Sequence, residues 1–141
     1  MDVRDAAIFE PAFALVALTF VVWVRMYWLR LAELHRGRIA AQAVATSQES
    51  ARLLTDTRAS DNFRNLFELP VLFYAAVCVA AIADVVTPVS IALAWTFVAL
   101  RALHSLVHCT YNRVIHRFVL YVLGTFALFA LWAYLAVQVL R

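Results

Sequence analysis

The third apolar segment of the chain ends in a stripe of ionisable side chains. Arg101, His104 and His108 follow one another at i, i+3 and i+7, so a helix places all three on one face. A charge at membrane depth is costly and turns toward a helix bundle or a wet cavity rather than toward lipid. Guanidinium groups also bind carboxylates, so this face is a candidate site.

A second polar group opens the preceding apolar segment. Asn65 and Glu68 are i and i+3 on one helical face, and Arg64 precedes them. We predict that Glu68 and Arg101 pair, because pairing lowers the cost of burying either charge. A purely structural interpretation stays open, in which this ion pair joins two helices and both histidines of the stripe bind backbone or water.

The histidines also raise the alternative of a metal site. His104 and His108 are four residues apart and can bind one ion, with Cys109 or His116 as a third ligand. No fourth ligand is evident, and Cys109 points about 100° away from His108 around a helix. HExxH and CxxC patterns are absent from the sequence, so we predict no metal. Cys78 and Cys109 are expected to be buried free thiols.

Composition identifies the elements that must position these groups. The chain has 141 residues and is 65% hydrophobic, far above the roughly 45–50% that is usual in soluble proteins. Four windows have about the 20 residues that a membrane-crossing helix needs, and together they leave too little polar surface for a soluble core. We predict one all-α, multi-pass membrane domain over residues 1–141, with spans at about 11–31, 66–83, 85–110 and 118–140.

The arginines are distributed unevenly between the connections. Six lie between the start of the first connection and the second span, two flank the last turn, and the turn over residues 83–88 has none. The positive-inside rule therefore predicts that both Arg-bearing connections are cytoplasmic and both termini lie on the opposite side, in the inner (plasma) membrane of the cell. We expect the long first connection to be helical, Thr87 and Pro88 to start the third span, and Pro70 to shape or bend the second.

Two segments carry a resemblance to a known family. "RNLFELP" opens the second span, and "RALHSLVHCTYNRVIHR" closes the third and leads into the fourth. In order and spacing they resemble the MAPEG family, the membrane-associated proteins of eicosanoid and glutathione metabolism, in a bacterial-type member. The resemblance covers nearly the whole chain. It implies a left-handed, up-down bundle of four transmembrane helices that assembles as a homotrimer with its sites at subunit interfaces.

The resemblance also implies a set of site residues. The chain matches the Arg-Asn-x-x-Glu element of glutathione-using members and the Arg-x-x-His-Ser/Thr motif of the prostaglandin synthase type, which continues with an Arg and a Tyr at the start of the fourth span. Two positions depart from the pattern: His108 stands where the family usually has Tyr, and Pro70 comes one residue early. The implied glutathione-binding residues are Arg30, Arg64, Asn65, Glu68, Arg101, His108 and Arg113, and the implied catalytic residues are His104, Arg117 and Tyr121, with Ser105 completing the motif.

These matches imply a glutathione-dependent transferase or peroxidase that acts on a lipophilic electrophile from the bilayer. Arg117 would stabilise the thiolate, Tyr121 would donate a hydrogen bond near the sulfur, and His104 would orient it. Arg117 with Arg30 would clamp carboxylates, while Glu68 takes the amine and Asn65 the peptide. The expected partners are two further copies of the chain, membrane lipid and a lipophilic small molecule, without nucleic acid. The alternative is a non-catalytic, lipid-binding or scaffold member of the same family.

Overall fold

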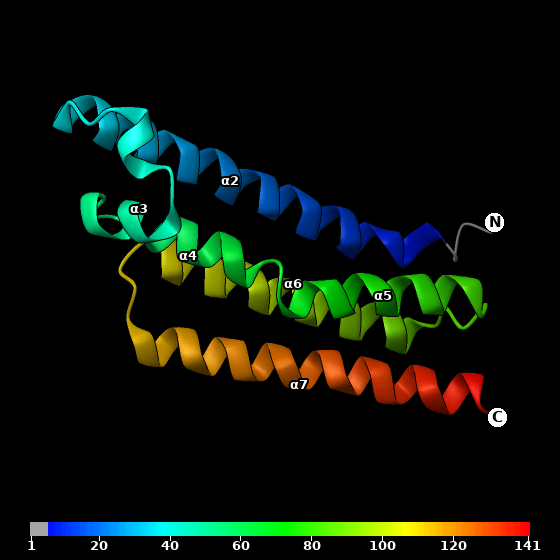
Figure 1. Ribbon diagram of the computed structural model, residues 1–141. Coiled ribbons are helices and arrows are strands. Elements are labelled where there is room, and N and C mark those ends of the chain that lie inside the picture. Colours follow the sequence, from blue (N-terminus) through cyan, green and yellow to red (C-terminus); the bar gives the residue numbers. More distant parts are fainter. Residues whose placement is uncertain (1–5) are drawn as a thin grey trace.

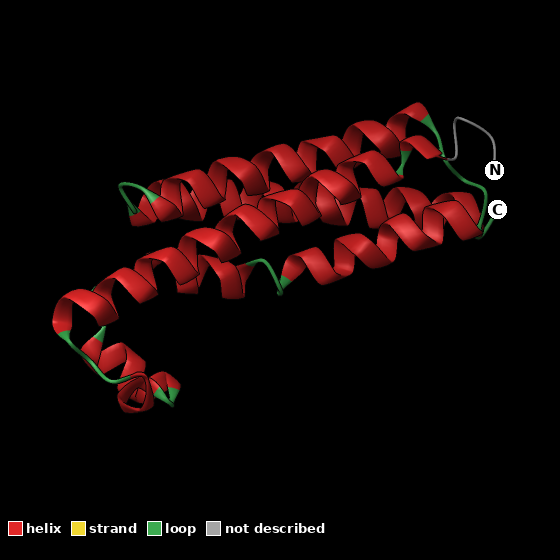
Figure 2. Ribbon diagram, turned by 90° about the horizontal axis from the view of Figure 1, so that it is seen from above, coloured by secondary structure: helices red, strands yellow, loops and turns green. Residues whose placement is uncertain are grey.

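The computed structural model describes residues 6–141, and every regular element in that range is a helix (Figures 1 and 2). The predicted domain also includes residues 1–5, which lie outside this description. In chain order the elements are α2 (Phe9–Gly37), η1 (Ala41–Val44), α3 (Ser47–Leu53), α4 (Arg58–Asn65), α5 (Leu69–Ile82), α6 (Pro88–Cys109) and α7 (Val114–Val139).

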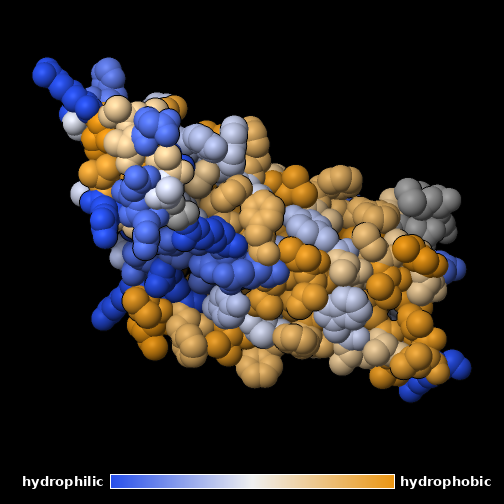
Figure 3. All heavy atoms as spheres, in the orientation of Figure 1, coloured by the Kyte–Doolittle hydropathy of each residue, from blue (hydrophilic) through white to orange (hydrophobic). Residues whose placement is uncertain are grey.

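Four stretches are long and apolar enough to cross a membrane, as the sequence predicts. They are Phe9–Gly37, Arg58–Ile82, Pro88–Cys109 and Val114–Val139. The helices run up and down, so the first connection and the α6–α7 turn lie at one end, and the α5–α6 turn lies at the other (Figure 1). On the face shown in Figure 3, hydrophilic residues gather at the end that carries both Arg-bearing connections, and most of the rest of that face is hydrophobic. The all-α four-helix bundle is thus confirmed.

The second span is broken into α4 and α5. Pro70 lies in the first turn of α5, where its missing N–H costs nothing but its ring prevents α4 from continuing. Residues 66–68 form the break, in which the N–H of Glu68 makes only a long 3.5 Å contact with the carbonyl of Asn65. The prediction that Pro70 shapes this span is confirmed, and the break leaves the Asn65 carbonyl open to a side-chain donor.

The start of α6 has the predicted cap. Thr87 accepts a hydrogen bond from the N–H of Ser90, and the Ser90 hydroxyl accepts one from the N–H of Thr87, which forms a capping box before Pro88. The Thr87 hydroxyl also lies 2.9 Å from the hydroxyl of Tyr134 on α7. This contact ties the turn between α5 and α6 to the end of α7.

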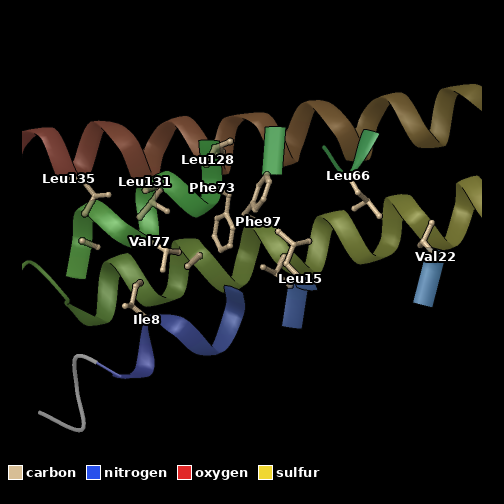
Figure 4. Close-up of a cluster of buried hydrophobic side chains, with 14 of the residues drawn as sticks. Ile8, Leu15, Val22, Leu66, Phe73, Val77, Phe97, Leu128, Leu131 and Leu135 are labelled. Atoms are coloured by element: carbon tan, nitrogen blue, oxygen red, sulfur yellow. The ribbon is translucent and has the colours of Figure 1, made fainter. Parts of the chain in front are cut away.

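The core lies between α5, α6 and α7, with α2 along one side (Figure 4). Phe73 and Phe97 stack with their ring centroids 4.9 Å apart. Gly124 lies where α7 approaches α6, because a Cβ there would be 3.7 Å from Leu100 and 4.0 Å from the Arg101 side chain. In lipid such close packing, rather than exclusion of water, holds helices together. The distances of 3.7 and 4.0 Å are ordinary van der Waals distances, so an alanine at this position would also allow the approach of α7 to the buried Arg101.

The first connection is helical, as predicted, and is anchored to the C-terminal end of α6. Arg58 donates to the carbonyl of Thr110 at 2.5 Å, and Arg25 of α2 donates to the carbonyl of Cys109 at 2.8 Å. Both contacts satisfy carbonyls that the end of a helix leaves open. The two cysteines are free thiols, as expected; Cys109 is buried, but Cys78 is exposed, which corrects the prediction for that residue.

Acid is expected to weaken this anchor through Asp56, which precedes α4. Its carboxylate accepts two hydrogen bonds from Arg58, at 2.7 and 2.8 Å, and these hold the pKa of Asp56 below its usual range. The stabilisation is therefore complete above about pH 4 and is lost as the pH falls further, and it amounts to at most about 1 kcal/mol because the pair is half-exposed. Thermal unfolding of wild type and Asp56→Asn against pH measures it; a stability gap that persists unchanged to pH 3 contradicts this prediction.

A buried polar contact joins α4 to α6. The Asn62 amide is fully buried, donates to the thiol of Cys109 at 3.4 Å and accepts from the hydroxyl of Ser105 at 3.3 Å. Asn62→Ala should destabilise the protein by about 1–3 kcal/mol, because the Ser105 hydroxyl then loses its buried acceptor. Thermal unfolding in detergent measures the loss, with the exposed Gln48→Ala as control. Equal melting temperatures in the two variants would count against this role of Asn62.

Candidate functional site

The Arg101 side chain lies inside the bundle, at 1% exposure. Its Nη2 donates to the Asn65 carbonyl at 2.5 Å, and its Cζ lies 5.3 Å from the centroid of the Tyr121 ring, within cation–π range. The predicted ion pair with Glu68 is wrong, because the single ion pair within residues 6–141 joins Arg58 to Asp56. Arg101 therefore fixes the end of α4 and the ring of Tyr121 rather than a carboxylate.

His104 is buried on the same face of α6 and contacts α7. Its Nδ1 lies 3.1 Å from the carbonyl of Arg117, and because a carbonyl only accepts, Nδ1 is the donor. The other ring nitrogen, Nε2, is buried and has no hydrogen-bond partner among residues 6–141. In the neutral ring this Nε2 carries a free lone pair. The Tyr121 ring is close by, with 6.0 Å between the two ring centroids.

The third residue of the stripe, His108, contacts the side chain of Arg117. The Arg117 Nη1 lies 2.5 Å from the His108 Nε2. A guanidinium has no acceptor, so Arg117 donates and His108 must be neutral at Nε2, with its proton on Nδ1. The rings of His104 and His108 are packed edge to face, with their centroids 5.6 Å apart. The prediction that Arg101, His104 and His108 form one inward-facing stripe is confirmed, since all three are buried.

A hollow of about 200 Å³ opens beside this stripe. It is bounded by residues from the end of α4, from α6 and from the first two turns of α7, namely Asn65, His104, Val114, Arg117, Phe118 and Tyr121. Four of these six are candidate residues from the sequence. Val114 and Phe118 are exposed on the α7 surface, so the hollow opens toward the side of the bundle.

The remaining sequence candidates lie elsewhere in the subunit. Arg30 and Arg64 border a different hollow of about 360 Å³ beneath η1 and α3, together with Asp56 and Asp61. Glu68 and Arg113 are exposed and border neither hollow. One subunit therefore brings together Asn65, His104, Arg117 and Tyr121, backed by Arg101 and His108, but not Arg30, Arg64, Glu68 or Arg113.

The chain also matches a known protein family as a whole. A family model described as the MAPEG family matches residues 8–137, nearly the whole chain. The chain belongs to the MAPEG family. The family includes glutathione transferases and related proteins. Searches among individual curated proteins and among solved structures give no match.

The donors at this MAPEG site fit an anionic ligand. Within the described residues, Arg101 has two buried nitrogens without a hydrogen-bond partner, Nε and Nη1, and Arg117 has one, Nε. Unpaired buried donors are costly, and in the described part of the chain no carboxylate forms an ion pair with either side chain. Among residues 6–141, Arg117 is the guanidinium that borders the hollow, so it can offer a donor to an anion bound there.

The stripe of this MAPEG chain does not form a metal cluster in residues 6–141, where no three His, Cys, Asp or Glu side chains group as metal ligands. The Nε2 of His108 already accepts a hydrogen bond from Arg117, and the thiol of Cys109 accepts one from Asn62.

The sequence did not reveal the role of Asn62, because an Asn in a polar connecting segment looks like a solvated residue. Its only signal is that it lies one helical turn before Leu66, which is buried on the same face.

Proposed function

We propose that the chain is a glutathione-dependent membrane transferase that joins the thiol to a lipophilic electrophile. The observation that carries this proposal is the hollow that Asn65, His104, Arg117 and Tyr121 line at the polar end of the bundle. These four residues are among those that match the family's motifs, and Arg117 has a buried donor, Nε, without a partner in residues 6–141.

The chemistry follows from the groups around the hollow. The Arg117 guanidinium favours the thiolate over the thiol by electrostatic attraction. The free Nε2 lone pair of His104 accepts the thiol proton, because its Nδ1 is already committed to the Arg117 carbonyl. The Tyr121 hydroxyl donates to the sulfur and keeps it oriented. Arg101 acts indirectly, by holding the Asn65 carbonyl and the Tyr121 ring.

An electrophile reaches this sulfur from the bilayer past Val114 and Phe118, which are exposed beside the hollow. With a carbon electrophile, the sulfur lone pair forms the new C–S bond and the leaving group departs with its bonding electrons. With a lipid hydroperoxide, the sulfur attacks an oxygen and the O–O bond breaks. The released alkoxide takes the proton held by His104, and a second glutathione reduces the sulfenic acid to disulfide and water.

We further propose that the functional unit is a homotrimer in the cell's inner membrane, with both Arg-bearing connections in the cytoplasm. A single subunit leaves Arg30 and Arg64 beside a separate hollow, away from Arg117. In the family the sites form between subunits, and such an arrangement would bring the partner subunit's Arg30 to the hollow that contains Arg117. The exposed Glu68 would then bind the amine of the tripeptide, and Arg113 would lie at the rim.

Thermal unfolding of the purified protein against a panel of low-molecular-weight thiols tests the proposal. A ligand that binds only the folded protein raises the melting temperature by mass action, so glutathione should raise it and cysteine should not. Turnover of a hydrophobic chloronitrobenzene with glutathione should follow. Absence of both effects refutes the proposed function.

The alternative is a non-catalytic, lipid-binding or scaffold protein. It is favoured by the fact that Arg101 and Arg117 both make contacts inside the subunit, with Asn65 and His108. It requires no turnover with any electrophile and a melting temperature that glutathione leaves unchanged. It also requires that the polar stripe stabilises the bundle, which substitution of Arg101 can test.

A further inference from the structure

We propose that His108 is a positioning residue that holds the Arg117 guanidinium at the hollow, and that it does so only as a neutral acceptor. This inference rests on the proposed function for its effect on glutathione, but not for the contact itself. The position is the one at which the chain departs from the tyrosine usual in the family.

The contacts of Arg117 define what His108 contributes. The Arg117 carbonyl accepts from His104, and its Nη1 donates to His108. Both contacts come from α6, one turn apart, so α6 fixes the backbone and the tip of the same arginine on α7. The long Arg117 side chain has several rotatable bonds and loses much of its conformational entropy when it binds a ligand. A contact that orders the side chain beforehand reduces that loss.

Only one protonation state of His108 allows its hydrogen bond with Arg117. The His108 ring can accept from Arg117 only through an unprotonated Nε2, which places its proton on the buried Nδ1. Protonation would put two cations 2.5 Å apart and replace a charge-assisted hydrogen bond by repulsion. The charged or titratable groups that face His108 are Arg117 from α7, His104 from α6 and Asp61 from α4. A tyrosine hydroxyl could also accept from the guanidinium, but it would not lose this ability by protonation.

The test uses two substitutions that separate the acceptor from the ring. His108→Gln keeps an acceptor near the Nε2 position, whereas His108→Leu fills similar space without one. We expect the dissociation constant for glutathione to rise roughly three- to tenfold in His108→Leu, the range for ordering one flexible side chain on binding, and to stay within about twofold of wild type in His108→Gln. His116→Leu, on the exposed first turn of α7, is the matched control and should bind as wild type does.

A second measurement needs no ligand. Nitrogen-15 NMR of histidine-labelled protein at pH 7.5 distinguishes the two neutral tautomers, and the signal that disappears in His108→Gln belongs to His108. We expect the Nδ1–H tautomer in wild type and a loss of that preference in Arg117→Ala. If wild-type protein binds no glutathione, the proposed function fails while the tautomer still tests the contact. The inference is overturned if His108 carries its proton on Nε2, or if His108→Leu binds glutathione as tightly as wild type.

Discussion

Replacing Arg117 by alanine is expected to lower the rate of glutathione conjugation by about 10²–10³-fold, the loss typical of removing one group that stabilises a developing or formed anion. Arg117 is the only guanidinium that lines the α4–α6–α7 hollow within the described chain, and Arg101 behind it makes its one hydrogen bond to a carbonyl. Without Arg117 the thiol regains its ordinary acidity and only a small fraction ionises at neutral pH.

Arg117→Lys separates charge from geometry. An ammonium keeps the positive charge but cannot span His108 and the ligand with one planar fork, so we expect an intermediate rate. The pH dependence of the rate is the decisive measurement, because a loss of thiolate stabilisation moves the profile to higher pH whereas a loss of folding does not. Arg52→Ala, an exposed arginine on α3, serves as control and should retain the wild-type profile. A wild-type rate in Arg117→Ala would remove this residue from the proposed mechanism.

The sequence predicts the fold of this chain well because the signals for membrane helices are strong and local. Four apolar windows, a Thr-Pro start for α6 and an early proline in α5 each follow from one element's own residues. Helix bounds were less well predicted, because the second span includes α4, whose polar surface hides its buried Asn62. The inward face of Arg101, His104 and His108 was predictable from spacing alone.

The partners of that stripe were not predictable from sequence. Arg101 donates to the Asn65 carbonyl, which is available only because Pro70 breaks the helix after it. A backbone acceptor of this kind has no side-chain signature, so the sequence favoured the visible carboxylate of Glu68 instead. The contact between Arg117 and His108 depends likewise on how close α7 comes to α6, and no single residue of the sequence marks that distance.

Other candidate residues are placed by family resemblance and not by the geometry of one subunit. Arg30 lies on α2 and borders the hollow under α3, and Glu68 is exposed at the break between α4 and α5. Their proposed roles require a neighbouring subunit to complete the site. The fold of a single chain follows from its own periodicity, whereas a site shared between chains depends on surfaces that periodicity does not describe.

Replacing Arg101 by methionine is expected to weaken glutathione binding by at least about tenfold while leaving thermal stability unchanged or raising it by about 1–4 kcal/mol. The guanidinium is buried, and in the described part of the chain two of its nitrogens have no hydrogen-bond partner and no carboxylate pairs with it. Its desolvation is therefore poorly compensated. Methionine fills similar volume without that cost, at the loss of one hydrogen bond to the Asn65 carbonyl. Binding weakens because Asn65 and the Tyr121 ring lose the group that fixes them beside the hollow.

Arg101→Met also distinguishes the transferase from the scaffold protein, because the two functions predict different changes in the melting temperature. A buried charged residue that serves ligand binding destabilises the protein in the absence of its ligand. Replacing it therefore leaves the melting temperature without glutathione unchanged or raises it. A residue retained to hold a scaffold together stabilises the bundle, so its removal lowers that temperature. Leu103→Met, on the exposed face of the same helix, controls for the new side chain. A marked loss of stability in Arg101→Met, with glutathione binding unaffected, would support the scaffold over the transferase.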